Sequence, residues 1–196
     1  MRAITLALLL PAACVAGEFN KKLSLGDPAP SWKDLPGTDG KKHALADHAD
    51  KDVVVIVFTC NSCACSEEYE DRIIAFAKKY KDKVALVAVN VNTIPEDRLD
   101  AMKKKAEKKK FPFPYLYDES QKIARDYGAK YTPEFVVLTR DRKVAYMGAM
   151  DDRTNVADVK ERYLEAAVDS LLKREKVAKG ETNPHGCLIR FKRTRD

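Results

Sequence analysis

Hydrophobic runs long enough to span a membrane as a stable anchor are missing from this 196-residue sequence, which excludes a multipass membrane protein. Glycine and proline are scarce, with eight and nine residues, and 45% of the residues are hydrophobic. That balance excludes a fibrous or disordered chain. No internal repeat, low-complexity segment or linker rich in serine and glycine divides the sequence. The length suits one globular domain and excludes a large multidomain enzyme.

Histidine is rare as well. The sequence holds only His43, His48 and His185, and they have no recognisable zinc-binding spacing. Cysteine is more frequent than in a typical cytosolic protein, with five residues. The first question for function is whether these cysteines are structural, metal-binding or redox-active.

Acidic residues are outnumbered, 30 against 36 basic ones, which gives a formal net charge of +6. The basic residues gather at residues 103–110 and near the C-terminus. Neither stretch is interleaved with stacking aromatic side chains, so we expect no nucleic-acid partner. We interpret the first stretch as the solvated end of a helix and expect weak attraction to anionic surfaces or acidic proteins at most.

Residues 1–17 have the layout of a secretory signal peptide, with Arg2 before a short apolar run and small residues after it. We therefore predict export, to the periplasm or the exterior, and a mature chain of a domain over residues 18–178 and a basic C-terminal tail over residues 179–196. Cleavage would remove Cys14 and leave four cysteines. In an alternative reading Cys14 is lipidated, although Pro11 stands where a lipoprotein signal usually has an aliphatic residue. Membrane attachment is expected only in that case.

Strand and helix patterns alternate along the rest of the chain. Turn-forming residues around Asp39-Gly40 predict a hairpin near the N-terminus. Residues 53–58 form a continuous apolar, β-branched run, typical of a strand covered on both faces. Further elements are expected as a helix through residues 69–80, a strand at 84–91, a helix opened by Pro95, a strand at 114–118, a helix at 120–127, a hairpin of 135–138 with 144–147, and an amphipathic helix over 156–172. This order predicts an α/β fold with a mixed central sheet flanked by helices.

The candidate redox site is Cys60-Asn61-Ser62-Cys63, where the first long predicted strand ends and a helix begins. Unpaired N–H groups and the positive dipole end of a helix stabilise a thiolate and lower its pKa. The C-x-x-C spacing lets the second sulfur reach the first, so the pair can cycle between dithiol and disulfide. We therefore assign Cys60 as an accessible nucleophile and Cys63 as the resolving thiol. A C-x-x-C at a strand-to-helix junction in an α/β chain is a strong redox signal.

Other roles for the cysteines stay open. A purely structural disulfide in this segment would close too short a loop to stabilise much. A copper or zinc site using Cys60, Cys63 and Cys65 would lack a fourth ligand. Cys65 is expected on another side of the helix, as a buried free thiol or an additional redox thiol. Cys187 is either a buried anchor of the tail or a further redox partner that reaches the active-site turn.

The sequence resembles the redoxin branch of the thioredoxin superfamily. This branch includes thiol–disulfide oxidoreductases and alkyl hydroperoxide reductase/thiol-specific antioxidant proteins. The resemblance covers residues 26–172: the turn-rich opening, the strand at residues 53–58 with its C-x-x-C, and the segment Tyr131-Thr132-Pro133-Glu134-Phe135. It implies a thioredoxin-like fold with an N-terminal hairpin extension. It also implies a cis Pro133 that faces the active-site disulfide, a substrate groove of Thr132, Pro133 and Glu134, and a Thr132 backbone that can pair with an extended peptide.

Several residues depart from the family patterns. Thr59 stands where thioredoxins have tryptophan, and Val54 stands where they have a buried aspartate that assists proton transfer. The general base is therefore unassigned, and Glu134 is a candidate proton acceptor or electrostatic tuner, with a solvated surface carboxylate as the alternative. The peroxiredoxin pattern P-x-x-x-[TS]-x-x-C fits neither Cys60 nor Cys63, which disfavours a dedicated peroxiredoxin.

The sequence thus predicts an exported thiol–disulfide oxidoreductase whose catalytic residues are Cys60 and Cys63. We expect no cofactor and no bound metal. The expected partners are protein or small-molecule disulfides, or hydroperoxides, together with an external thiol redox partner. Two alternatives remain: a thiol-dependent hydroperoxide reductase, with sulfenic acid at Cys60 or Cys63, and a non-enzymatic copper or zinc carrier.

Overall fold

A computed structural model describes residues 17–193 of the chain. The predicted signal peptide, apart from Gly17, lies outside the described residues. None of the described helices is long and apolar enough to cross a membrane.

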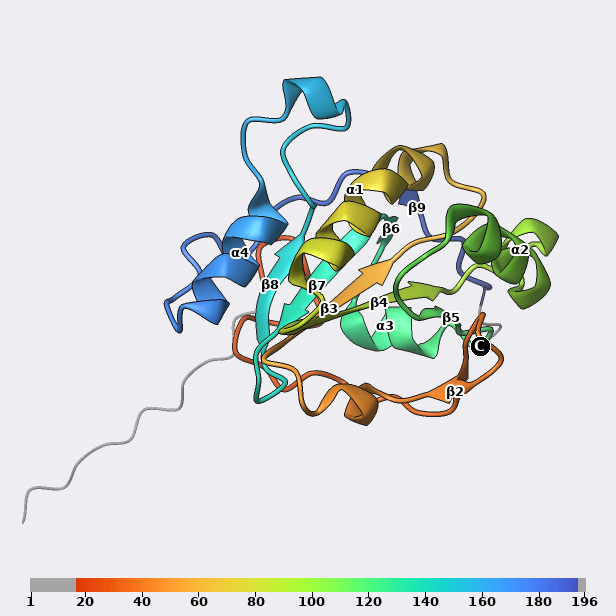
Figure 1. Ribbon diagram of the computed structural model, residues 1–196, viewed down its shortest axis with the longest axis horizontal. Helices are drawn as coiled ribbons and strands as arrows, with labels where there is room; N and C mark the ends of the chain where they lie inside the picture. The colour runs from red at the N-terminus through yellow and green to blue at the C-terminus, as the bar shows by residue number, and fades with distance from the viewer. Residues whose placement is uncertain (1–16, 194–196) are drawn as a thin grey trace, which may run out of the picture.

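A mixed five-stranded sheet forms the centre of the molecule, with the strand order β5-β4-β3-β7-β8 (Figure 1). Its strands are β3 (Val53–Phe58), β4 (Val84–Asn90), β5 (Tyr115–Tyr117), β7 (Glu134–Leu138) and β8 (Val144–Gly148). The pairs β3–β4 and β4–β5 are parallel, whereas β3–β7 and β7–β8 are antiparallel. This confirms the predicted α/β class and the thioredoxin-like arrangement.

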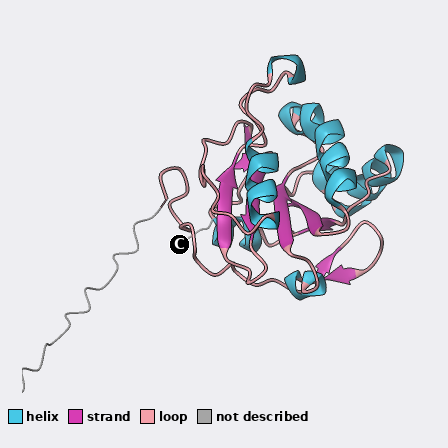
Figure 2. Cartoon of the chain, turned by 60° about the vertical axis from the view of Figure 1, so that its left-hand side comes forward, coloured by secondary structure: helices cyan, strands magenta, loops and turns pink. Residues whose placement is uncertain are grey.

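Helices cover both faces of this sheet (Figure 2). They are α1 (Ala64–Tyr80), α2 (Leu99–Lys109), α3 (Lys122–Tyr127) and α4 (Tyr163–Leu172). The side chains of β3 alternate between the faces: Val53, Val55 and Val57 pack with α1 and α4, while Val54, Ile56 and Phe58 pack with α3 and the N-terminal segment. All six are at most 1% exposed, which explains why the β3 sequence is apolar at every position.

The predicted hairpin near the N-terminus is also present. Strands β1 (Leu35–Pro36) and β2 (Lys42–His43) pair antiparallel, and Gly40 in the turn has a φ of 78°, a conformation that glycine adopts without steric cost. A short 3₁₀ turn follows at Leu45–His48. Together these elements run along the α3 side of the sheet (Figure 1).

Two expected helices begin later than the sequence pattern indicates. Pro95–Asp97 forms a separate 3₁₀ turn, and Arg98 is extended before α2 begins. The expected helix over residues 156–172 is likewise divided into a 3₁₀ turn at Val156–Asp158 and α4. Between them, the Asp152 carboxylate accepts the N–H groups of residues 160 and 161, so that backbone does not join a helix.

The C-terminal segment folds back onto the domain. Strand β9 (Cys187–Leu188) pairs antiparallel with β6 (Tyr131–Thr132), and Ile189 is buried. Earlier in the segment, the Thr182 hydroxyl lies 2.6 Å from the Tyr146 hydroxyl inside the protein. The segment after residue 178 is therefore attached to the domain at Thr182, β9 and Ile189, and the boundary at residue 178 stays a prediction.

Candidate active site

The two cysteines of the C-x-x-C motif lie between β3 and α1, as predicted. After β3, residues 59–62 turn, and Cys63 is the N-cap of α1, where its Sγ accepts the Ser66 N–H at 3.4 Å. Opposite this turn, the peptide bond between Thr132 and Pro133 is cis, which confirms the expected proline geometry. The fold thus brings residues 60, 63, 132 and 133 together from two distant parts of the sequence.

Both sulfurs are enclosed. Cys60 and Cys63 are each 3% exposed and hydrogen-bond to one another. Cys60 Sγ lies 3.6 Å from the Thr132 hydroxyl, and Cys63 Sγ lies 3.2 Å from the Thr132 carbonyl oxygen, to which its protonated form donates. The expectation that the first sulfur is accessible is therefore wrong, because residue 132 and the segment paired with it cover the turn.

The pKa directions of the two thiols differ from the roles that the sequence indicates. The pKa of Cys63 is lowered to about 3, against the effect of burial. The largest cause is the hydrogen bond from Cys60, and the contacts with Cys187, Thr132 and the Ser66 N–H add to it. The same hydrogen bond and burial raise the pKa of Cys60, and the nearby Asp97 carboxylate adds to the rise. Because Cys63 also accepts the Ser66 N–H at the helix N-terminus, a thiolate is favoured on Cys63 over Cys60.

This charge distribution predicts a pH profile. Since the pKa of Cys63 is lowered, the reduced protein should keep a thiolate, measured by its ultraviolet absorbance, at about pH 5, where an ordinary cysteine is protonated. Cys63→Ser should remove that absorbance. Cys60→Ala should move the titration to higher pH, because it removes the hydrogen bond that lowers the pKa most. If thiolate absorbance at about pH 5 remains in Cys63→Ser, the nucleophile is Cys60, as the sequence indicated.

A buried carboxylate that the sequence interpretation missed holds the turn in place. Asp97 is fully buried, and its Oδ1 accepts the N–H groups of Asn61 at 2.7 Å and Ser62 at 3.0 Å. Its Oδ2 accepts the Ser62 hydroxyl at 2.6 Å and the side-chain amide of Asn92 at 3.1 Å. Both residues between the two cysteines are therefore fixed by one carboxylate. In the sequence, Asp97 looked only like an acid at a helix N-terminus.

Part of the lysine stretch at residues 103–110 also supports this region instead of lying free in solvent. Lys105 and Lys109 form ion pairs with Glu70 of α1, whose side chain is only 6% exposed. Lys105 Nζ in addition donates to the Asn61 carbonyl oxygen at 3.4 Å. The interpretation of the whole stretch as a solvated helix end is therefore wrong for these two residues.

Glu134 lies beside the cis proline, and its carboxylate is held by the backbone that precedes that proline. It accepts the backbone N–H groups of Lys130 and Tyr131 at 2.7 and 2.9 Å. The side chain is 5% exposed, which excludes a solvated surface carboxylate, and burial raises its pKa. Within residues 17–193 it has no hydrogen bond to a cysteine. Glu134 therefore stabilises the loop before the proline, and a direct role as proton acceptor is not supported.

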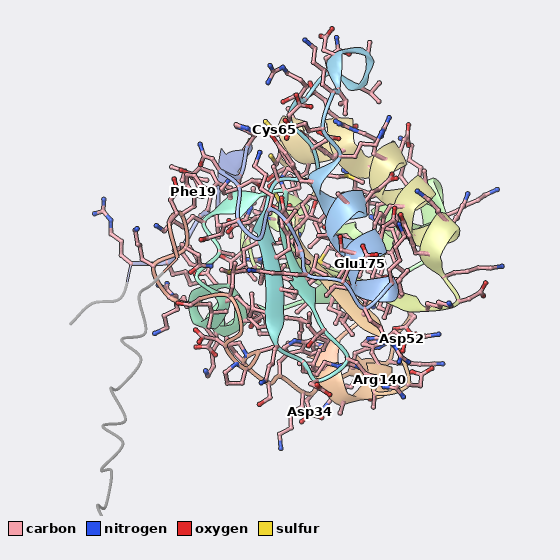
Figure 3. The ribbon with its side chains drawn as sticks, turned by 90° about the vertical axis from the view of Figure 1, so that its left-hand side faces the viewer. Phe19, Asp34, Asp52, Cys65, Arg140 and Glu175 are labelled. Carbon is pink, nitrogen blue, oxygen red and sulfur yellow. The ribbon has the colours of Figure 1, made fainter. Side chains whose placement is uncertain are left out.

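The remaining two cysteines lie next to the pair. The Sγ atoms of Cys63, Cys65 and Cys187 all lie within 4.8 Å of one another. Cys65 is half-buried at the start of α1 (Figure 3), so the expectation that it points to another side of the helix is wrong. Cys187 is exposed and is not a buried anchor. Three thiolates at this separation could also bind a soft metal ion, with a different set of cysteines from the one that the sequence suggested.

Comparisons with known proteins identify the family and related folds. The chain matches the Redoxin family over residues 24–163. It is similar to the structure of an uncharacterized conserved protein from Geobacillus kaustophilus, with a TM-score of 0.82 and 36% identity over 88% of this chain and 94% of that one. A hypothetical protein from Sinorhizobium meliloti has a TM-score of 0.82 and 32% identity over 88% of this chain and 97% of that one.

More distant structures share the fold alone. The exposed lipoprotein thioredoxin of Streptococcus pneumoniae has a TM-score of 0.57 and 19% identity over 71% of this chain and 99% of its own. No curated protein matches the sequence. With the family match spanning residues 24–163, the chain belongs to the Redoxin family and is a thiol oxidoreductase of that family with a thioredoxin-like fold.

Proposed function

We propose that this protein is an exported thiol–disulfide oxidoreductase that uses Cys60 and Cys63 as its dithiol/disulfide couple. One observation carries the proposal: the two thiols lie together at the N-terminus of a 17-residue helix, and both sulfurs contact Thr132 beside its cis bond to Pro133. A helix N-terminus stabilises a thiolate, and a neighbouring thiol that keeps its proton is ready to resolve a mixed disulfide.

Reduction of a disulfide substrate begins at Cys63. The Cys63 thiolate attacks one substrate sulfur, a mixed disulfide forms, and the other substrate sulfur leaves as a thiolate. Cys60 then loses its proton to that leaving thiolate and attacks Cys63 Sγ. The mixed disulfide breaks, the Cys60–Cys63 bridge closes, and the substrate leaves as a dithiol. An external dithiol reduces the bridge again, and the reverse sequence oxidises a substrate.

Export is the second part of the proposal. It rests on the sequence of residues 1–17 and fits an oxidising compartment, where a cycling disulfide has use. The mass of the mature chain from a secreting host tests it. Loss of the leader supports export, whereas a lipid adduct at Cys14 supports the lipoprotein form with membrane attachment.

Loss of either thiol of the couple should abolish turnover. In an assay of the reduction of a peptide disulfide with excess external dithiol, Cys60→Ser and Cys63→Ser should each lose on the order of 10²-fold or more, because the covalent cycle needs both sulfurs. Cys65→Ser removes a thiol outside the couple and should keep most of the rate. Full turnover in either of the first two variants would contradict the proposed function.

The same preparations discriminate the alternatives. Consumption of hydroperoxide without disulfide exchange would favour a hydroperoxide reductase that forms sulfenic acid. One copper or zinc ion per purified chain, lost on substitution of Cys63, Cys65 or Cys187, would favour the metal carrier, which the proximity of these three sulfurs makes chemically feasible. Disulfide exchange that needs residues 60 and 63 supports the proposal over both.

A further inference from the structure

The strand edge that was expected to bind an extended peptide is occupied by the protein's own C-terminal segment. Strand β9 lies beside β6 (Figure 1) and pairs with it antiparallel, with Cys187 opposite Thr132 in the register. The approach is close: a Cβ on Gly186 would lie 2.3 Å from the Thr132 carbonyl oxygen. Because this contact leaves no room for a side chain at residue 186, the segment is fitted to the groove.

This covering segment separates the buried couple from solvent. The sulfurs of Cys60 and Cys63 belong to residues that are 3% exposed, whereas Cys187 in the covering strand is exposed. A folded partner can therefore contact Cys187 directly, but it cannot reach the couple while β9 is paired. The proposed chemistry consequently requires either a release of β9 or a route through it.

The sulfur positions provide such a route. Cys63 hydrogen-bonds both to Cys60 on its inner side and to Cys187 on its outer side. The interaction with Cys63 and burial raise the pKa of Cys187 to about 12 in the reduced protein, so Cys187 keeps its proton while Cys63 is the thiolate. Cys63 is thus a neighbour of both Cys60 and Cys187, and since the Sγ atoms of Cys63 and Cys187 lie within 4.8 Å of each other, a disulfide between them needs only a small displacement.

We propose that Cys187 is a third redox thiol, through which the buried Cys60–Cys63 couple exchanges electrons with an external partner. We call this route through Cys187 the relay. This inference rests on the proposed function and assigns the residue that meets the partner. The partner is a dithiol or a disulfide that accepts attack at an exposed strand rather than in an open groove.

Reduction of the oxidised couple by a reduced partner proceeds in two stages. Cys187 loses its proton and attacks Cys63 Sγ, the Cys60–Cys63 bond breaks, the Cys63–Cys187 bond forms, and Cys60 leaves as a thiolate that takes up a proton. A partner thiolate then attacks Cys187 Sγ, and Cys63 leaves as the thiolate. The second partner thiol displaces Cys187, so the partner departs oxidised and the couple remains as a dithiol.

The kinetic test follows reduction of the Cys60–Cys63 disulfide by reduced glutathione, quenched and mapped by mass spectrometry. Cys187→Ser should slow reduction at least about tenfold, while the equilibrium position of the couple in a glutathione buffer stays unchanged. Leu188→Ser is the matched control, because Leu188 is the exposed neighbour in the same strand and carries no sulfur. An unchanged or faster rate in Cys187→Ser overturns the relay and leaves the proposed function standing.

A trapping test gives an independent readout. In Cys60→Ser the inner partner of Cys63 is absent, so mild oxidation with glutathione disulfide should accumulate the Cys63–Cys187 bridge, and the bridge should persist when Cys65 is also replaced by serine. If the only disulfide formed is Cys65–Cys187, it is a structural disulfide, and the relay is overturned. One zinc or copper ion per chain that depends on Cys187, without any Cys63–Cys187 bridge, would overturn it in favour of a metal site.

Failure of the relay and failure of the proposed function give different results. If Cys60→Ser and Cys63→Ser keep full disulfide turnover, the couple is not the redox centre and both proposals fall. If these two variants are inactive while Cys187→Ser exchanges with glutathione at the rate of the unmodified protein, only the relay falls.

Discussion

Replacing Asp97 with alanine is expected to lower the free energy of unfolding by about 3–5 kcal/mol and to disorder the turn between the active-site cysteines. The size of the effect follows from the number of groups that would lose their acceptor. Two backbone N–H groups of the turn, the Ser62 hydroxyl and the side-chain amide of Asn92 all donate to this one carboxylate. Each buried donor left unpaired costs roughly 1–3 kcal/mol.

Asp97→Asn tests the charge separately from the shape. An asparagine keeps one oxygen acceptor but places an N–H₂ group against donors, so part of the stability should be lost. Its loss of negative charge should also lower the pKa of Cys60, which Asp97 now raises. Asp97 is therefore a positioning residue whose removal changes both the melting temperature and the pH profile of Cys60 alkylation.

Glu96→Ala is the matched control for Asp97→Ala. Glu96 is the adjacent acid in the same 3₁₀ turn and its side chain is exposed; its backbone carbonyl accepts a hydrogen bond from the Asn61 side chain. Denaturant unfolding of the two variants should therefore differ by several kcal/mol. Equal stabilities would show that the carboxylate does not hold the turn.

Local sequence patterns predicted the centre of the fold well. The strand at residues 53–58 carries apolar side chains at every position because both faces of the sheet are covered, and that requirement is readable from the run itself. The position of the C-x-x-C after this strand followed directly. Helix α4 was placed too early, because Val156 and Val159 continue its apolar spacing although Val156 is 56% exposed. The side chain of Asp152 decides that boundary.

The parts of the site that sequence could not provide depend on long-range contacts. Asp97 follows Pro95 and Glu96, so its local context indicates a helix start, whereas its partners in the active-site turn lie about 35 residues earlier in the chain. Cys187 is 124 residues from Cys63, and only the pairing of β9 with β6 brings the two sulfurs together. The covered groove has the same origin, since the strand that fills it follows the last helix.

The loop after β8 depends on a buried ion pair that fixes it to α1. Asp151 is 2% exposed, and its Oδ2 lies 2.6 Å from Nη1 of Arg72, which is 11% exposed. The same guanidinium donates to the carbonyl oxygens of Arg153 at 3.1 Å and Thr154 at 2.6 Å. It also stacks on the ring of Tyr69, 3.7 Å from the ring centroid. One side chain thus joins the helix that carries Cys63 to the segment that leads to α4.

Arg72→Ala is accordingly expected to lower the free energy of unfolding by about 3–5 kcal/mol, because it leaves the Asp151 carboxylate buried without its cation. For a chain of this size, thermal unfolding followed by circular dichroism should show a fall in Tm of roughly 6–20 °C. Arg140→Ala is the matched control, because Arg140 and Asp52 form an ion pair whose side chains are 70% and 45% exposed (Figure 3). An exposed pair contributes below about 1 kcal/mol, so its loss should move the Tm little.

The double variant Arg72→Met with Asp151→Leu separates the cost of an unpaired charge from the loss of packing. Removing both charges eliminates the buried ion, so the double variant should be more stable than Arg72→Ala, and apolar replacements of buried ion pairs are often neutral. The coupling energy from a full double-mutant cycle of Arg72→Met and Asp151→Leu should reach at least about 1.5 kcal/mol. Additive effects, or a loss in Arg72→Ala no larger than in Arg140→Ala, would mean that the loop is fixed by its backbone contacts and not by this pair.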